Sequence, residues 1–108
     1  MTQTITEKWP TNVLRIATGR YLDTGTVAAY EFETGFKPRY VRVINNTSGD
    51  EYCWIEGMTD AYAVKRVAAG TSAQTTSLGI TVGERGFTMG LDLDMNATSE
   101  QVSWVAFG

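Results

Sequence analysis

Short alternating apolar segments, bounded by turn residues, run through almost the whole chain. The clearest is Tyr40–Asn45, in which we expect Val41 and Val43 to face inward and Arg42 outward. Alternation with a period of two is typical of a strand with one buried face. Turn signals every eight to twelve residues favour antiparallel sheets over a parallel sheet with crossover helices. The sequence therefore predicts an all-β fold, an antiparallel β-sandwich or jelly-roll-like single domain of about seven to eight short strands.

A stretch of asparagine, serine and glycine at 45–50 separates that segment from Glu51–Glu56. These residues tolerate positive φ and favour tight turns. Tyr52 and Trp54 share one face of the returning segment, so we predict a β-hairpin here. A second hairpin is expected around Gly83–Gly86, between two shorter apolar segments.

Two strands are expected before the first hairpin, at 13–16 and at 27–32. The first leads to Gly19, which we interpret as following the strand. In the second, Tyr30 and Phe32 share one face and the glutamates beside them the other. The residues between the two strands carry an Asp-Thr-Gly turn signal.

The stretch 59–70 fits two descriptions. Asp60 could cap a helix that ends at Gly70. Alternation through the middle of the stretch indicates a strand instead, and the β-rich surroundings favour the strand. Residues 71–77 are expected to form a polar loop or an edge strand.

The last segment, Gln101–Phe107, is again alternating and apolar. Because chain ends fray unless a sheet holds them, we expect this segment to belong to the core of a complete domain spanning 12–108. Residues 1–11 are polar, with Ile5 and Trp9 as their large apolar members. They form either a tail packed on the domain or an arm that reaches a neighbouring subunit, anchored by Ile5 and Trp9.

The charge distribution argues against nucleic acid as a partner. The net charge is −3, and residues 1–54 are balanced, so the second half holds the whole acidic excess. Nucleic-acid-binding proteins normally carry a basic excess, because phosphate contacts supply much of their affinity. The sequence also lacks an apolar run of about eighteen residues and a signal-peptide pattern. We therefore expect that the protein is synthesised in a cytoplasm and does not associate with membranes.

The residues that usually carry catalysis are scarce. The chain has no histidine, and its one cysteine, Cys53, lies in an apolar segment that predicts a buried small side chain. We find no nucleophile paired with a base, no poised carboxylate pair and no metal-binding set. The sequence therefore predicts a protein that is not an enzyme and needs no cofactor.

Asp92, Asp94 and Asn96 have the spacing that opens an EF-hand calcium loop. The rest of that pattern fails, because Ala97 stands at the glycine position and Ser103 at the position of the bidentate glutamate. A solvated polar loop is the favoured interpretation, and a calcium site of another type stays open as the alternative.

Lys37, Arg39, Tyr40 and Arg42 form a small basic and aromatic cluster. Such a cluster is either a solvated strand face or a contact for an acidic partner surface. We keep these four residues as candidate partner contacts, beside Ile5 and Trp9 of the N-terminal segment.

Four stretches taken in order resemble small structural proteins of tailed-phage virions. The resemblance covers about residues 28–108, and its ordered set of motifs is more specific than any one of them. The stretches are Gly35–Asn45 followed by Trp54, Gly79–Val82, Gly86–Gly90, and Val102–Gly108. The proteins they resemble are capsid decoration (cement) proteins and head-fibre components.

This resemblance implies a non-enzymatic protein that binds the outside of a phage head and stabilises it. Its partner would be the major capsid protein, its location the surface of the virion, and its oligomeric state a homo-oligomer, with a trimer favoured. Symmetric assembly would also cover edge strands that otherwise invite aggregation.

Two alternatives remain at this stage. The first is a receptor- or glycan-binding module of a phage head or tail fibre, with tyrosines that stack on sugars. Its candidate residues are Tyr21, Tyr40, Tyr52 and Tyr62. The second is a head–tail connector or tail component, which would form rings of higher order than a trimer.

Overall fold

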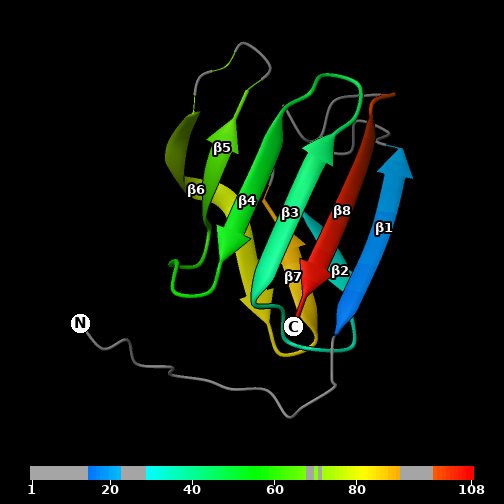
Figure 1. Cartoon of the computed structure of the whole chain (residues 1–108), viewed down its shortest axis with the longest axis vertical. Coiled ribbons are helices and arrows are strands. Elements are labelled where there is room, and N and C mark those ends of the chain that lie inside the picture. The colour runs from blue at the N-terminus through cyan, green and yellow to red at the C-terminus, as the bar shows by residue number, and fades with distance from the viewer. Residues whose placement is uncertain (1–14, 23–28, 68–69, 71, 91–98) are drawn as a thin grey trace, which may run out of the picture.

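The computed structural model is an all-β fold in which eight antiparallel strands form one sheet (Figure 1). It describes residues 15–22, 29–67, 70, 72–90 and 99–108. In chain order the strands are β1 (Ile16–Leu22), β2 (Tyr30–Glu33), β3 (Tyr40–Asn45), β4 (Glu51–Ile55), β5 (Tyr62–Arg66), β6 (Ser72–Gly83), β7 (Gly86–Met89) and β8 (Gln101–Phe107).

The sheet curls on itself, so that its two ends face each other across a shared core. The strand order is β1-β8-β3-β4-β5-β6-β7-β2. Strands β1, β8, β3 and β4 form a front layer, and β7 and β2 lie behind them (Figure 1). Tyr21 of β1 contacts Tyr30 and Phe32 of β2, with ring centroids 4.7 and 5.5 Å apart. The fold confirms the predicted all-β, sandwich-like class.

The predicted hairpin at 45–50 is the β3–β4 connection. Val41 pairs with Trp54 and Val43 with Tyr52, and all four side chains are buried. The buried amide of Asn45 organises the turn. Its Oδ1 accepts the backbone N–H groups of Thr47 and Ser48, at 2.9 and 3.0 Å. The second predicted hairpin is β6–β7, in which Gly83 pairs with Gly86.

The ambiguous stretch at 59–70 forms the strand β5 and not a helix. Strand β5 pairs with β4 on one side and β6 on the other. Residues 72–75 of β6 pair with β5, whereas β7 pairs only with residues 80–83. Of the two descriptions given for 71–77, polar loop or edge strand, the strand is therefore correct for residues 72–77. Between the two halves of β6, Leu78 adopts a positive φ of 59°, and the pairing with β5 shifts register.

An aromatic cluster fills the space between the two layers. Phe32, Phe87 and Trp104 come from β2, β7 and β8, and their ring centroids lie 5.1 to 5.4 Å apart. Tilted and edge-on aromatic pairs of this kind add to the free energy gained by burial. Strand β8 lies between β1 and β3, so the prediction that the last segment belongs to the core is confirmed.

Two predicted strand boundaries are wrong. Strand β1 spans Ile16–Leu22 and runs through Gly19, where the prediction ended the strand before that glycine. The indole of Trp104 lies over Gly19, and a Cβ there would be 2.6 Å from the ring. The glycine therefore marks a close approach inside the strand. The segment predicted at 27–32 is strand β2, Tyr30–Glu33, and residues 13–14 and 23–28 lie outside the described part of the chain.

Candidate docking surface

The outward side chains of β1, β8, β3, β4 and β5 form one continuous surface, which we call the outer face. It is the side of the front layer turned toward the viewer in Figure 1. The pairings of the strands align these side chains in cross-strand rows. The residues of the outer face are Ile16, Thr18, Arg20, Leu22, Tyr40, Arg42, Ile44, Glu51, Cys53, Ile55, Val64, Arg66, Gln101, Ser103, Val105 and Phe107.

The lower row of the outer face is entirely apolar or aromatic. It runs across four strands, and its members pair side by side, from Ile16 through Phe107 and Tyr40 to Ile55. Ile16 and Ile55 are 51% and 57% exposed, and Val64 in the next row is 43% exposed. Large apolar side chains scattered singly over a surface are ordinary, but a contiguous apolar patch marks an interaction surface.

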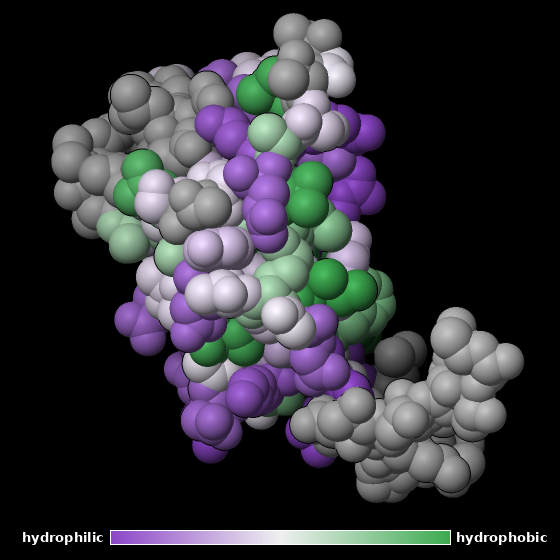
Figure 2. All heavy atoms as spheres, turned by 90° about the vertical axis from the view of Figure 1, so that its left-hand side faces the viewer, coloured by the Kyte–Doolittle hydropathy of each residue, from purple (hydrophilic) through white to green (hydrophobic). Residues whose placement is uncertain are grey.

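The neighbouring side of the molecule, formed by β5 and β6, is more mixed. There, hydrophobic residues reach the surface in small patches bordered by hydrophilic ones (Figure 2). The outer face differs because its apolar side chains adjoin one another across strands.

The charges of the outer face centre on Glu51, whose side chain is only 12% exposed. Arg42 and Arg66 each donate to this carboxylate, at 2.7 and 2.8 Å. The hydrogen bond and the charge of Glu51 raise the pKa of Arg42 above its ordinary value, so the guanidinium stays protonated. Arg20 adds a third arginine on β1. With three arginines and one glutamate the outer face carries a net charge of +2, whereas the whole chain carries −3.

Cys53 lies at the middle of the outer face, opposite Arg42 and Val64 on the adjacent strands. It is half-buried, where the sequence predicted a buried small side chain. The reason is the strand parity, which turns Tyr52 and Trp54 inward and the residue between them outward. A hydrogen bond between the side chains of Tyr40 and Cys53, and then partial burial, raise the pKa of Tyr40.

The structure separates the candidate contacts that the sequence placed together. Tyr40 and Arg42 belong to the outer face. Arg39 has the opposite strand parity to Tyr40 and Arg42. It makes a bidentate ion pair with Glu56, at 3.0 and 3.1 Å. Lys37 is exposed in the loop before β3. Ile5 and Trp9 lie outside the described residues.

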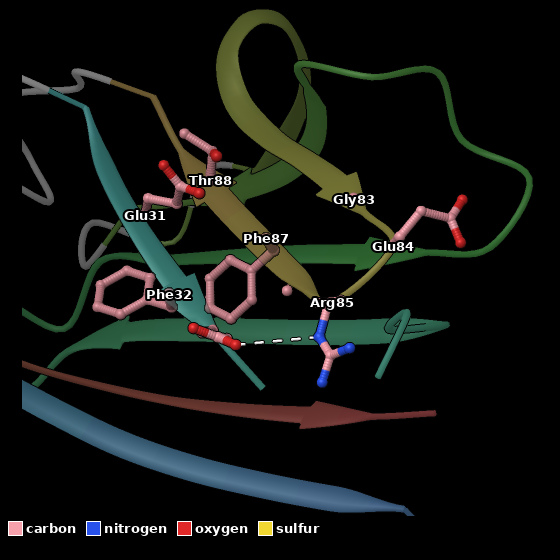
Figure 3. Close-up of a pocket in the computed structure, with 9 residues that line it drawn as sticks. Glu31, Phe32, Gly83, Glu84, Arg85, Phe87 and Thr88 are labelled. Atoms are coloured by element: carbon pink, nitrogen blue, oxygen red, sulfur yellow. Dashed lines mark ion pairs between the residues drawn. The ribbon is translucent and has the colours of Figure 1, made fainter. Parts of the chain in front are cut away.

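A second surface feature is an open hollow of about 320 Å³ at the β6–β7 turn and β2 (Figure 3). Glu31, Glu33 and Glu84 line it, together with Phe32 and Phe87 of the aromatic cluster. The ion pair between Glu33 and Arg85 is long, 3.9 Å, and both side chains are at least 75% exposed. It is therefore heavily screened by water and leaves the hollow with an acidic balance. We call this feature the acidic hollow.

Sequence reasoning missed most of the outer face. Ile16, Ile55 and Phe107 are far apart in the chain and meet only through the order of the strands. A local signal did exist, since Ile55 and Val64 occupy the outward positions of their alternating segments, where a solvated strand would carry polar residues.

The remaining expectations concern metal ions and membranes. Among the described residues, no group of three histidine, cysteine, aspartate or glutamate side chains is placed to hold a metal ion. The candidate calcium ligands Asp92, Asp94 and Asn96 lie outside those residues. The part of the chain that the structure describes contains no helix long and apolar enough to cross a membrane.

The tyrosines considered for sugar stacking differ in accessibility. Tyr52 is fully buried, so its ring cannot stack on a ligand at the surface. Tyr21 packs against Tyr30 and Phe32 in the core. Tyr40 and Tyr62 are half-buried, as is Tyr21, and neither Tyr40 nor Tyr62 belongs to the core cluster.

Comparisons with known proteins assign no family to the chain. No protein-family model matches it, and neither a curated protein nor a solved structure gives a significant match. The chemistry of the two surfaces and the sequence resemblance therefore carry the functional argument.

Proposed function

We propose that this chain is a non-enzymatic virion structural protein, a capsid decoration (cement) protein that binds the outside of a phage head and stabilises it. The observation that carries the proposal is the outer face, whose apolar row runs across four strands and is followed on β5 by the exposed Val64. Such a surface suits a protein partner, because its affinity comes from the area buried and from shape. The resemblance to phage virion proteins supplies the context in which such partners occur.

The architecture suits a part that must stay rigid while it is bound. Every strand except the two at the sheet ends pairs on both sides, and the aromatic cluster joins the layers. A rigid surface loses little conformational entropy on docking. Many copies on one shell would then combine individually modest contacts into strong overall stabilisation.

The candidate contacts with the major capsid protein are Ile5, Trp9, Lys37, Arg39, Tyr40 and Arg42, as the sequence predicts. Of the four in the described part of the chain, Lys37 and Arg39 lie beside the lower end of β3, and Tyr40 and Arg42 lie on the outer face. In this proposal the N-terminal segment anchors the domain on a neighbouring subunit of the shell. A homo-oligomer, with a trimer favoured, would match the symmetry of such a lattice.

Binding to emptied phage heads tests the proposal. Full-length chain should cosediment with DNA-free heads that lack their decoration, and it should saturate at a fixed number of copies per head. A chain without residues 1–10 should remain folded by circular dichroism but lose this binding. If the shortened chain decorates heads normally, the anchoring role of the N-terminal segment is wrong. If the full chain does not bind at all, the proposed function is wrong.

A glycan- or receptor-binding module is the second candidate, because Tyr40 and Tyr62 are only half-buried and lie outside the core cluster. Aromatic rings with one exposed face are suited to stacking on sugars. A glycan array distinguishes the two: specific signal that disappears with Tyr40→Ala would favour this candidate, whereas a blank array together with head binding would favour the decoration protein.

A further inference from the structure

We propose that the outer face of one copy docks onto the acidic hollow of the next copy, so that the chain assembles head to tail through two different surfaces. The inference goes beyond the proposed function, because it concerns copies of this chain alone. Both proposals use the outer face, so in any one copy docking on a second copy and docking on the shell exclude each other. Its basis is the complementarity of two surfaces that lie on different parts of the sheet.

The two surfaces have opposite charge of similar size. The outer face carries three arginines and one glutamate, a net charge of +2. The acidic hollow carries three glutamates and Arg85, a net charge of −2. Opposite potentials steer two surfaces together and fix their relative orientation.

Shape and exposed apolar side chains add to the match of charge. Ile16 and Ile55 are more than half exposed on the outer face. The acidic hollow is concave, while the rings of Phe32 and Phe87 beside it pack in the core, with Phe87 only 2% exposed. A concave partner surface that carries carboxylates would cover these isoleucines and face the arginines at the same time.

The same charges argue against the symmetric alternative, in which two outer faces pack on each other. That arrangement would bring six arginines together with only two glutamates. Both copies of Glu51 are already engaged by Arg42 and Arg66 of their own chain. The unbalanced positive charge would oppose association.

Head-to-tail docking has a structural consequence. An interface between two different surfaces produces a closed ring if the rotation between copies closes, and an open chain if it does not. In either case a copy that loses one surface can still use the other. This property separates head-to-tail docking from a symmetric dimer in solution.

Sedimentation velocity with two complementary variants provides the test. The face variant, Arg20→Glu with Ile55→Glu, makes the outer face acidic at two exposed positions. The hollow variant, Glu31→Arg with Glu84→Arg, makes the hollow basic at two exposed positions. Arg42, Glu51 and Arg66 are left intact, because the buried carboxylate they share contributes to folding. Thermal unfolding confirms that both variants fold.

The wild-type chain should associate with increasing concentration, and its dissociation constant should rise at least about tenfold between 0.05 and 0.5 M NaCl. Each variant alone should be monomeric. A mixture of the two should associate again, because the acidic hollow of one meets the basic face of the other. Asp60→Lys, an exposed change outside both surfaces, should associate like the wild type.

Three results would overturn the inference. The first is a wild-type chain that stays monomeric at millimolar concentration in low salt. The second is a hollow variant that still self-associates, which would indicate face-to-face packing. The third is a mixture that stays monomeric. All three results concern the free chain in solution, so failure here leaves the outer face available to the shell and the cosedimentation test of the proposed function intact.

Discussion

At the scale of single residues, Gly19 and Trp104 show how a poor strand former can be required inside a strand. Gly19 pairs with Trp104 across β1 and β8, and the indole occupies the space where a Cβ would lie. From the sequence alone, we interpreted this glycine as following the end of a strand. Its actual role depends on a tryptophan 85 positions away and cannot be read locally.

Replacing this glycine tests that role. Gly19→Ala should lower the free energy of unfolding by about 1–3 kcal/mol, because the methyl group forces the Trp104 ring out of its place. Thr18→Ala, at the exposed neighbouring position, should change it by less than about 0.5 kcal/mol. Urea denaturation of both variants measures the difference. Equal effects would mean that the ring adjusts without cost.

At the residue scale the candidate site was predictable only in part. Tyr40 and Arg42 were identified because they are neighbours in the sequence. Arg39 belongs to the same cluster, but strand parity gives it a different partner, Glu56. Local clustering of basic residues therefore predicted the region of the surface but not which side chains share it.

At the scale of elements, the β3–β4 hairpin was predictable because its turn is built from local chemistry. Asn45 accepts two backbone N–H groups of the turn, and its Nδ2 donates to Glu100 at 3.1 Å. Strand β5 was ambiguous for a related reason. Asp60 and Gly70 satisfy the rules for helix ends, and pairing with strands on both sides decides the outcome.

Removing the amide of Asn45 should therefore weaken the hairpin. Asn45→Ala should lower the free energy of unfolding by about 2–3 kcal/mol, because the side chain is fully buried and two backbone N–H groups of the turn lose their acceptor. Asn46→Ala, at an exposed position in the same turn, should cost less than about 1 kcal/mol. Thermal or urea unfolding provides the measurement. An Asn45→Ala variant as stable as Asn46→Ala would show that the turn does not depend on this side chain.

At the scale of the whole molecule, the strand order creates what no single segment predicts. Strand β8, from the end of the chain, lies between β1 and β3, and this insertion aligns Ile16, Phe107, Tyr40 and Ile55 in one row. The fold class followed from alternation and turn spacing alone. The outer face did not, because it depends on pairings between distant strands.

The same order fills the interior of the described part of the chain and leaves the outward strand positions as its surfaces. The curl of the sheet places the aromatic cluster between the layers, where it fills the interior. The outward positions then face away from this interior. A packed interior with an apolar patch on its outside suits the decoration role that we propose.

Electron cryomicroscopy of DNA-free phage heads incubated with the folded chain is the most direct test of the decoration role. The account predicts added density at fixed lattice positions on the outside of the shell, with a β-domain of this shape at each position. Heads that remain bare at a saturating concentration of folded chain would contradict it.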